Sequence, residues 1–250
     1  MIAILTRDHA FFESFTDNKE WMRRHEYRNC RIENYSRAIE YAHQQGFRSV
    51  RVGRVSDNHL EVEPDGYVDY SASTVQSDLM DLVLATRCEF IVTCSSGLDC
   101  LYWLCGKALV GVNLPWLDGK LAVYSLVLPK RMMVEIDGAL TELPVIAVTS
   151  TAFVPRNSSN DVPRWNGNPV AFRENSAAEI LETMQLALAM QADPRLAEER
   201  RTLVAPLWAE FNRRMASSNL DAEAKASVPA MPMPDSAIAR FLEVPRDNPR

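Results

Sequence analysis

The sequence predicts an α/β fold, a Rossmann-like and mainly parallel sheet with helices on both faces, followed by C-terminal helices. Two observations support this prediction. Apolar β-type runs alternate with helical patterns over residues 1–113, and right-handed βαβ crossovers then give a parallel sheet. In the stretch from Phe90 to Gly106, an apolar run passes through Ser95-Ser96-Gly97 directly into a helical pattern. The chain has 250 residues, 47% of them hydrophobic, which is enough for a sizeable core.

The first half of the chain contains five predicted strands and three predicted helices. A helix is predicted over 33–45 because apolar residues recur at helical spacing and Gly46 ends the pattern. The helix over 77–87 begins at the N-cap residue Ser77, and we expect its buried face to carry Leu79, Leu82, Val83 and Thr86. The other predicted elements are strands at 1–6, 47–53, 67–70, from Phe90 and at 108–113, a helix after Gly97, and a long loop at 9–32 with a helical turn near 19–24.

The second half of the chain is predicted to be loops followed by helices. Residues 114–175 are rich in Pro, Asn and Gly and are expected to form loops. Ser176 and Glu179 form a capping box for a helix to about Met190, and a second helix is expected from Pro194 to about Met215. A linker over 217–234 and a short helix at 235–243 follow. We therefore divide the chain into a Rossmann-like domain (1–135), a loop and helical extension (136–216), and a linker, short helix and flexible tail (217–250).

Composition excludes several classes of protein. The formal net charge is −6, which argues against a general nucleic-acid binder. Eight arginines nevertheless fall between Met22 and Arg54, and this local positive charge suits an anionic small ligand. There is no signal peptide and no run long enough to span a membrane, so a cytoplasmic location is expected. The five cysteines form no C-x-x-C pair and are expected to be buried, reduced thiols.

Four turns of the predicted sheet fall at the carboxyl ends of its strands, where the ligand crevice of such a fold lies. The candidate binding residues in these turns are Arg7, Gly53, Arg54, Ser73, Ser95, Ser96 and Gly97. An arginine at a strand end can bind a diphosphate through two charge-assisted hydrogen bonds, and Arg7 is the strongest candidate. The N–H groups after Ser95 would suit a phosphate if a helix begins there. The simpler interpretation is a turn between a buried strand and a core helix.

Several acidic and histidine residues near these turns have two interpretations each. Asp8 and His9 are candidate general bases, although Asp8 is also a common type of turn or cap residue. Asp78 and Asp81 are candidate ligand contacts, but the helix macrodipole alone favours acids in a first turn. Neither a metal site nor a cofactor site is expected, and Walker, G-x-G-x-x-G and G-x-S-x-G motifs are absent from the sequence. Trp103 is expected in the core.

Several short motifs follow one another along the chain in a distinctive order. They are Tyr27-Arg-Asn29, Tyr35, Ala38-Ile39, Gly46, Val50-Arg-Val-Gly53, Val68-Asp-Tyr70, Ser77-Asp-Leu-Met-Asp81, Cys88-Glu-Phe90 and Ser96-Gly97. This order resembles a bacterial glycosyltransferase family associated with surface-polysaccharide gene clusters. The family is distantly similar to fucosyltransferase-like enzymes of the two-domain GT-B architecture, and the resemblance covers residues 1–133, with a fainter echo at 236–242.

The resemblance implies a nucleotide-sugar-binding half of a glycosyltransferase. In such enzymes the C-terminal Rossmann-like domain holds the nucleotide diphosphate, the arginine after the first strand binds phosphate, and a metal is generally not required. By resemblance, Arg7 and Ser95-Ser96-Gly97 take these positions. We expect transfer of a sugar from a nucleotide diphosphate donor to a glycan or lipid-linked acceptor. Because the match covers one of two domains, we expect either that a partner chain supplies the N-terminal half or that the protein is a donor-binding remnant. The alternative is a non-catalytic nucleotide-sugar-binding or assembly protein.

Overall fold

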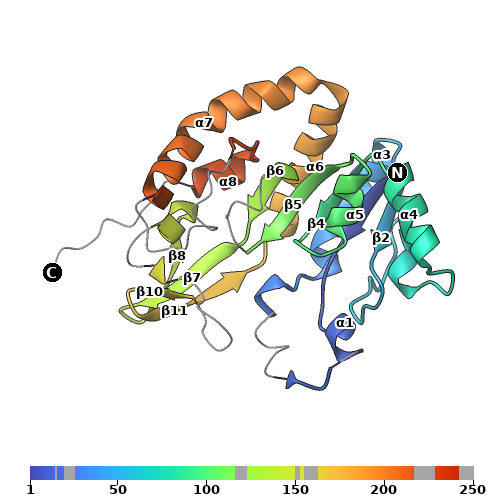
Figure 1. Ribbon diagram of the computed structural model, residues 1–250, viewed down its shortest axis with the longest axis horizontal. Helices are drawn as coiled ribbons and strands as arrows, with labels where there is room; N and C mark the ends of the chain where they lie inside the picture. The colour runs from blue at the N-terminus through green and yellow to red at the C-terminus, as the bar shows by residue number, and fades with distance from the viewer. Residues whose placement is uncertain are drawn as a thin grey trace.

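The computed structural model describes residues 1–14, 16–19, 26–115, 123–149, 153–154, 163–216 and 229–241. Its central element is a six-stranded, all-parallel sheet with the order β3-β2-β1-β4-β5-β6 (Figure 1). The predicted Rossmann-like fold is therefore confirmed. The strands are β1 (Ile2–Leu5), β2 (Ser49–Val52), β3 (Tyr67–Asp69), β4 (Phe90–Thr93), β5 (Ala108–Leu114) and β6 (Tyr124–Pro129). The order reverses between β1 and β4, which makes their carboxyl ends the topological switch point.

Helices cover both faces of this sheet. On one face α3 (Ser36–Gln44) contacts α6 (Ala177–Ala192), and α6 also packs on β5 and β6. On the other face α4 (Asp78–Arg87) contacts α5 (Asp99–Leu104), which packs on β4 and β5 (Figure 1). The N-cap bond from the Met80 N–H to the Ser77 hydroxyl is formed, as predicted. The shorter helical elements of this part are α1 (Ala10–Glu13), η1 (Glu26–Arg28), η2 (Ile32–Tyr35) and η3 (Tyr70–Ala72). The helical turn predicted near 19–24 falls largely outside the described residues.

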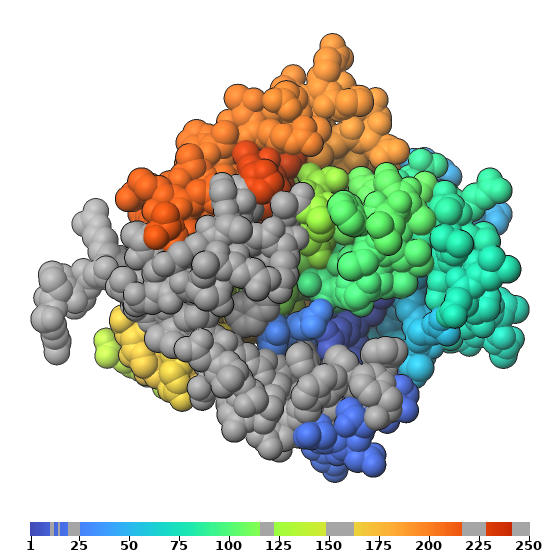
Figure 2. All heavy atoms as spheres, viewed as in Figure 1, coloured from blue at the N-terminus to red at the C-terminus, as the bar shows by residue number. Residues whose placement is uncertain are grey.

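The face of α4 that the sequence predicted to be buried is exposed. Leu79 is 71% exposed, and Leu82, Val83 and Thr86 also face solvent, whereas Ala85 is fully buried. The prediction that Trp103 lies in the core is wrong as well, because this α5 side chain is 53% exposed. Figure 2 shows both helices on the visible surface of the molecule. Met80, Leu84 and Ala85 contact the core instead.

The segment predicted as loops over 114–175 contains the last strand of the parallel sheet and a second, antiparallel sheet of order β8-β7-β11-β10-β9. Its strands are β7 (Arg131–Ile136), β8 (Ala139–Leu143), β9 (Phe153–Val154), β10 (Arg164–Trp165) and β11 (Asn168–Arg173), and η5 (Val145–Thr149) follows β8. The loop prediction was wrong because Asp137-Gly138 and Asn166-Gly167 are the tips of hairpins. All four residues have positive φ, which is typical of a two-residue type I′ turn.

Two asparagines join the antiparallel sheet to the parallel one. The Asn113 N–H donates to Asn175 Oδ1 at 2.8 Å, and the Asn175 N–H donates to Asn113 Oδ1 at 2.7 Å. Asn175 Nδ2 also donates to the Pro129 carbonyl at 2.8 Å. Both side chains are buried, and Asn113 adopts a positive φ of 57°. These bonds fix the end of β6, the end of β5 and the start of α6 relative to one another.

The C-terminal part forms two long helices and a short one, as predicted. The capping box of Ser176 and Glu179 opens α6, and α7 (Pro194–Ala216) follows with Pro206 inside it. The short helix α8 (Asp235–Ala239) packs beside α7, where Trp208 meets Phe241 in an edge-to-face contact with a centroid distance of 5.4 Å. The indole N–H of Trp208 donates to the Met231 carbonyl at 3.0 Å. Residues 229–234, expected to be part of a linker, therefore pack on the core through Met231 and Met233.

Candidate functional site

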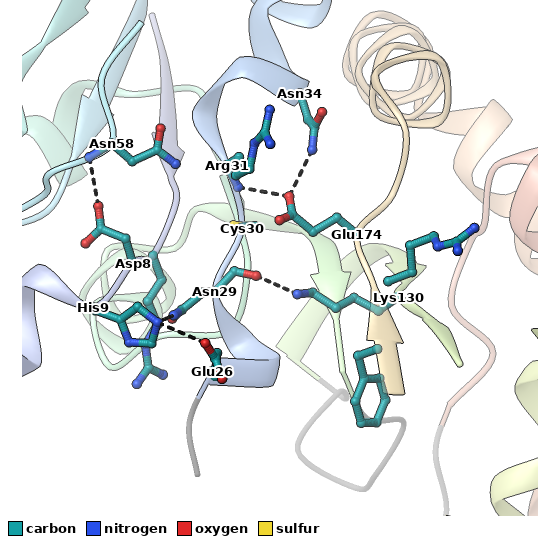
Figure 3. A pocket seen from close by; sticks show the side chains of 13 residues that line it. Asp8, His9, Glu26, Asn29, Cys30, Arg31, Asn34, Asn58, Lys130 and Glu174 are labelled. Carbon is teal, nitrogen blue, oxygen red and sulfur yellow. Dashed lines mark hydrogen bonds and ion pairs between the residues drawn. The ribbon is translucent and has the colours of Figure 1, made fainter. Parts of the chain in front are cut away.

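Two cavities meet at the switch point of the parallel sheet, and Arg7 and Asp8 line both of them. The smaller cavity has a volume of about 370 Å³ and lies over the carboxyl ends of β1 and β2. It is lined by Leu5, Thr6, Arg7, Asp8, Gly53, Arg54, Val55, Asp81, Ser96, Gly97 and Leu98. The larger cavity has a volume of about 650 Å³ and extends from β1 to the end of β11 (Figure 3). Of the predicted site residues, only Arg7, Asp8 and His9 line the larger cavity, whereas most of the others line the smaller one.

Arg7 stands between the cavities because it follows the central strand β1. Burial and, to a smaller extent, the positive charge of Arg28 lower the pKa of Arg7 to about 10. The two guanidinium groups therefore lie close enough to repel each other. Arg28 reaches this point from η1, and its Nη2 donates to the Ser95 carbonyl at 2.5 Å. Ser95 adopts a positive φ of 69°, which is uncommon for a residue other than glycine. The switch point thus gathers two cations.

The Asp8 carboxylate accepts four hydrogen bonds from other residues of the protein. Oδ1 accepts the Ala10 N–H at 3.1 Å. Oδ2 accepts the N–H groups of Asp57 and Asn58 at 3.0 and 3.2 Å and also the Ser56 hydroxyl. One of these four donors is at the start of α1 and three are in the loop after β2, so the Asp8 carboxylate holds this loop and the start of α1 together. Of the two interpretations of Asp8, the geometry favours the turn and cap residue over the general base.

His9 lies on the rim of the larger cavity, next to an acid and an amide. Its Nε2 is 3.4 Å from Glu26 Oε1 and 3.1 Å from Asn29 Nδ2 (Figure 3). The side chain is partly exposed, so a ligand in the cavity can reach it. A histidine beside a carboxylate is a suitable proton acceptor. Of the two candidate general bases, His9 therefore remains the better candidate.

The Ser95–Gly97 turn differs from the phosphate cradle that the sequence suggested. The helix α5 begins only at Asp99 and has six residues. The Asp99 carboxylate is buried and accepts bonds from the Ser96 N–H at 3.1 Å, the Thr93 hydroxyl at 2.5 Å and the Tyr124 hydroxyl at 2.7 Å. A carboxylate thus already occupies the space before this helix. Ser96 and Gly97 line the smaller cavity, and Ser95 contributes its carbonyl group to Arg28.

The remaining predicted binding residues lie on the outer side of the smaller cavity. Arg54 forms ion pairs with Asp78 and, at 3.3 Å, with Asp81, so its charge is already balanced. Gly53 lines the cavity, and its φ of 137° is one that side-chain-bearing residues rarely adopt. Ser73 lines neither cavity, and its hydroxyl accepts the Val75 N–H at 3.2 Å. Asp78 also lies outside both cavities, so its first-turn position fits the macrodipole interpretation.

Sequence reasoning missed several residues of the site. Thr6, which follows β1, lines the smaller cavity and is 6% exposed, and its buried hydroxyl has no hydrogen-bond partner among the described residues. Lys130 joins β6 to β7 and lines the larger cavity together with Phe172, Arg173 and Glu174 from the end of β11. The lysine between two apolar strand-like runs was the available signal. The prediction of loops over 114–175 hides this signal, because it does not place Lys130 at the end of a strand.

One of the five cysteines, Cys30, lines the larger cavity. Cys30, Cys88 and Cys94 are buried, in agreement with the sequence, but Cys100 is exposed and Cys105 is half-buried. All five thiols are free. Within the described ranges, no group of three or more His, Cys, Asp or Glu side chains could hold a metal ion.

Comparisons with known proteins leave the family of the chain open. No protein-family model matches it, and neither a curated protein nor a solved structure shows significant similarity to it. No helix in the described part of the chain is long and apolar enough to cross a membrane. The function is therefore argued from the site itself.

Proposed function

We propose that the protein binds a nucleotide diphosphate sugar at the switch point and transfers the sugar to a glycan or lipid-linked acceptor. The observation that carries this proposal is the position of Arg7, which lines both cavities at the carboxyl end of β1, with the charge of Arg28 beside it. Two neighbouring guanidinium groups in a partly desolvated position favour a multiply charged anion such as a diphosphate. The motif order from Tyr27 to Gly97, which resembles glycosyltransferases, points to the same ligand.

The two cavities suggest how such a donor would lie. The smaller cavity is lined by glycines and by the apolar side chains of Leu5, Val55 and Leu98, which suits a nucleoside. Its buried Thr6 hydroxyl offers a hydrogen-bonding group for the ribose or base. The larger cavity is predominantly polar in its lining residues, which suits a sugar. The diphosphate then lies at Arg7, between the two.

In this arrangement the arginines act on the leaving group. When the bond between the sugar C1 atom and the diphosphate oxygen breaks, negative charge grows on the diphosphate. Arg7 and Arg28 stabilise that charge without having to reorganise. The acceptor hydroxyl oxygen forms the new bond to C1, and His9 takes its proton. No metal ion is required for these steps, because the two cations supply the charge.

A titration series tests the donor site. Isothermal titration with UDP, GDP, CDP and dTDP, each alone and as a sugar conjugate, should show binding of at least one nucleotide. Arg28→Gln should weaken that binding about tenfold or more, since a charged hydrogen bond contributes about 1.5–3 kcal/mol. Arg37→Gln is the matched control, because Arg37 is an exposed residue of α3 that lines neither cavity. Absence of binding by the whole panel, or equal losses in both variants, would contradict the proposal.

One observation favours a second candidate, a nucleotide-sugar-binding protein without transfer activity. The Asp8 carboxylate accepts four hydrogen bonds and leaves His9 as the one predicted base still available in the described site. A release assay for free nucleotide, with glycan or lipid extracts as acceptors, separates the two candidates. Turnover that disappears in His9→Gln supports transfer, and donor binding with no turnover under any acceptor supports the binding protein.

A further inference from the structure

We propose that the larger cavity binds a sugar that carries an anionic group, and that the Lys130 ammonium is the partner of that group. The inference rests on the proposed function and deepens it, because it specifies the class of sugar. It is carried by two polar groups on the cavity wall, Lys130 and Asn29, whose bonding capacity is not used within the described part of the protein.

Lys130 is a buried cation without a carboxylate partner. Its residue is 4% exposed and lines the larger cavity, and its Nζ donates to the Asn29 carbonyl oxygen at 2.5 Å (Figure 3). An ammonium group has three N–H donors, so this single bond leaves two of them over. No acid in the described ranges forms an ion pair with it. Buried charges in proteins are normally paired, because an unpaired ion is costly to remove from water.

Glu174, the carboxylate that acts on Lys130, is engaged elsewhere. Glu174 Oε2 accepts the Arg31 N–H and the Asn34 side-chain N–H, both at 2.9 Å (Figure 3). Burial lowers the pKa of Lys130, and Cys30, the more distant Glu174 and Cys94 together offset this effect only in part. A ligand anion in the cavity would remove this imbalance, because it can lie closer to Nζ than Glu174 does.

Asn29 supplies the second unused group. Its Oδ1 is buried and accepts no hydrogen bond within the described residues, while its Nδ2 lies 3.1 Å from His9 Nε2. An acceptor of this kind is satisfied by a hydroxyl group. A cation and an orphan acceptor on one wall, beside further amide side chains of Asn34 and Asn58, match a ligand with one anionic group and several hydroxyls. A carboxylate sugar and a phosphorylated sugar share this chemistry.

The experiment uses the full chain and saturation-transfer NMR with free monosaccharides, so that it does not depend on nucleotide binding. The panel is glucuronate, galacturonate and glucose 6-phosphate, with glucose and glucuronamide as neutral counterparts of the same shape. We expect the anionic sugars to bind at least about tenfold more tightly than the neutral ones. The uronates and the hexose phosphate separate the two sources of the anion. Equal binding of glucuronate and glucuronamide, or binding of neither, would overturn the proposal.

Two variants test whether Lys130 is responsible for the preference for anionic sugars. Lys130→Gln should remove the preference for the anionic sugars, so that glucuronate and glucuronamide give the same affinity. Lys107→Gln should keep the preference, because Lys107 precedes the amino end of β5 and lines neither cavity. If Lys130→Gln does not fold, the comparison of glucuronate with its amide on the unmodified protein still decides the question. A preference that survives in a folded Lys130→Gln would overturn the assignment to Lys130.

The outcome is independent of the donor-site test. Nucleoside diphosphates that bind while uronates show no preference over neutral sugars would leave the proposed donor site standing and remove the acidic-sugar specificity. Uronates that bind through Lys130 while no nucleotide binds would support the sugar subsite and contradict the donor proposal.

Discussion

Gly97 is the position at which a side chain can be added to the smaller cavity with little strain. A Cβ built there meets no other atom within 4 Å, and the backbone does not have a positive φ. We expect Gly97→Val to change the free energy of unfolding by no more than about 0.5–1 kcal/mol, because the residue is exposed. Nucleotide affinity should nevertheless fall at least tenfold, because the isopropyl group enters the cavity. Thermal unfolding and titration on the same sample measure both effects.

Cys100→Val provides the control for this substitution. Cys100 is exposed on α5, three residues further along the chain, and lines neither cavity. The Cys100→Val variant should therefore have the same nucleotide affinity as the original protein. If Gly97→Val also leaves affinity unchanged at normal stability, Gly97 does not face the ligand.

Asp8 offers a second test at the scale of one residue, and here stability is the quantity that changes. In Asp8→Asn one acceptor oxygen becomes an NH2 group, which cannot accept the backbone N–H groups of Asp57 and Asn58. The free energy of unfolding should fall by about 1–3 kcal/mol, the cost of leaving such groups unsatisfied. Asp57→Asn, an exposed neighbour in the same loop, should change it by less than about 0.5 kcal/mol. Urea unfolding measures both. A variant of Asp8 with full stability and lost turnover would restore its role as a catalytic base.

At the scale of the element, α4 is a helix whose apolar residues face in two directions. Leu79→Gln should leave the free energy of unfolding within about 0.5 kcal/mol of the original value, because the side chain is already solvated. Ala85→Gln should cost about 1–3 kcal/mol, since a larger polar side chain must enter a filled space. Denaturant unfolding compares the two. A loss of more than about 1 kcal/mol in Leu79→Gln would mean that this face is covered in solution.

Four charged side chains connect β7, β8, α6 and α8 and make this junction sensitive to acid. Arg131 lies 3.1 Å from both Glu142 and Glu179, and Arg240 lies 3.4 Å from Glu179. Burial opposes ionisation of Glu179, but hydrogen bonds from Ser176 and the charges of Arg240 and Arg131 outweigh it and hold its pKa below the usual 4.5. A carboxylate with a lowered folded-state pKa stabilises the protein above the unfolded-state pKa. That contribution is lost as the pH falls through the folded-state value.

The pH dependence can be assigned to Glu179 by substitution. The difference in free energy of unfolding between the original protein and Glu179→Gln should be largest near neutral pH and should shrink as the pH falls below 4.5. Urea titrations at a series of pH values measure this difference. A difference that stays constant down to pH 3 would show that the ionised form of Glu179 contributes nothing.

For the molecule as a whole, local patterns were enough for the elements that begin or end on a cap. The Ser77 cap, the Ser176 and Glu179 capping box and the stop at Gly46 are all present in the structure. The antiparallel sheet was missed because its Asp137-Gly138 and Asn166-Gly167 turns are also typical of loops, and because β9 and β10, with two residues each, are too short for a period-2 pattern. The exposed face of α4 depends on how the preceding loop enters the helix, which helical spacing alone does not determine.

The candidate site could also be predicted only in part from the sequence. The turns after β1, β2 and β4 were predictable because the carboxyl ends of parallel strands meet at one edge of the sheet. The sequence could not show that Asp8 is occupied by the loop over 56–58 or that Arg54 is paired with Asp78. These contacts join residues 24 to 50 positions apart. Lys130 and Asn29, 101 positions apart, meet only once the second sheet is in place.

The chain leaves the parallel sheet at Lys130 and comes back to it at Asn175, and these two points are held together by the bond from Asn175 to the Pro129 carbonyl. Residues 131–174 therefore have the geometry of a cassette inserted into a host fold through adjacent ends. Mutation, shortening or exchange of this cassette would alter the part of the larger cavity formed by Phe172, Arg173 and Glu174. The smaller cavity, which is built only from residues of the host, would keep its lining.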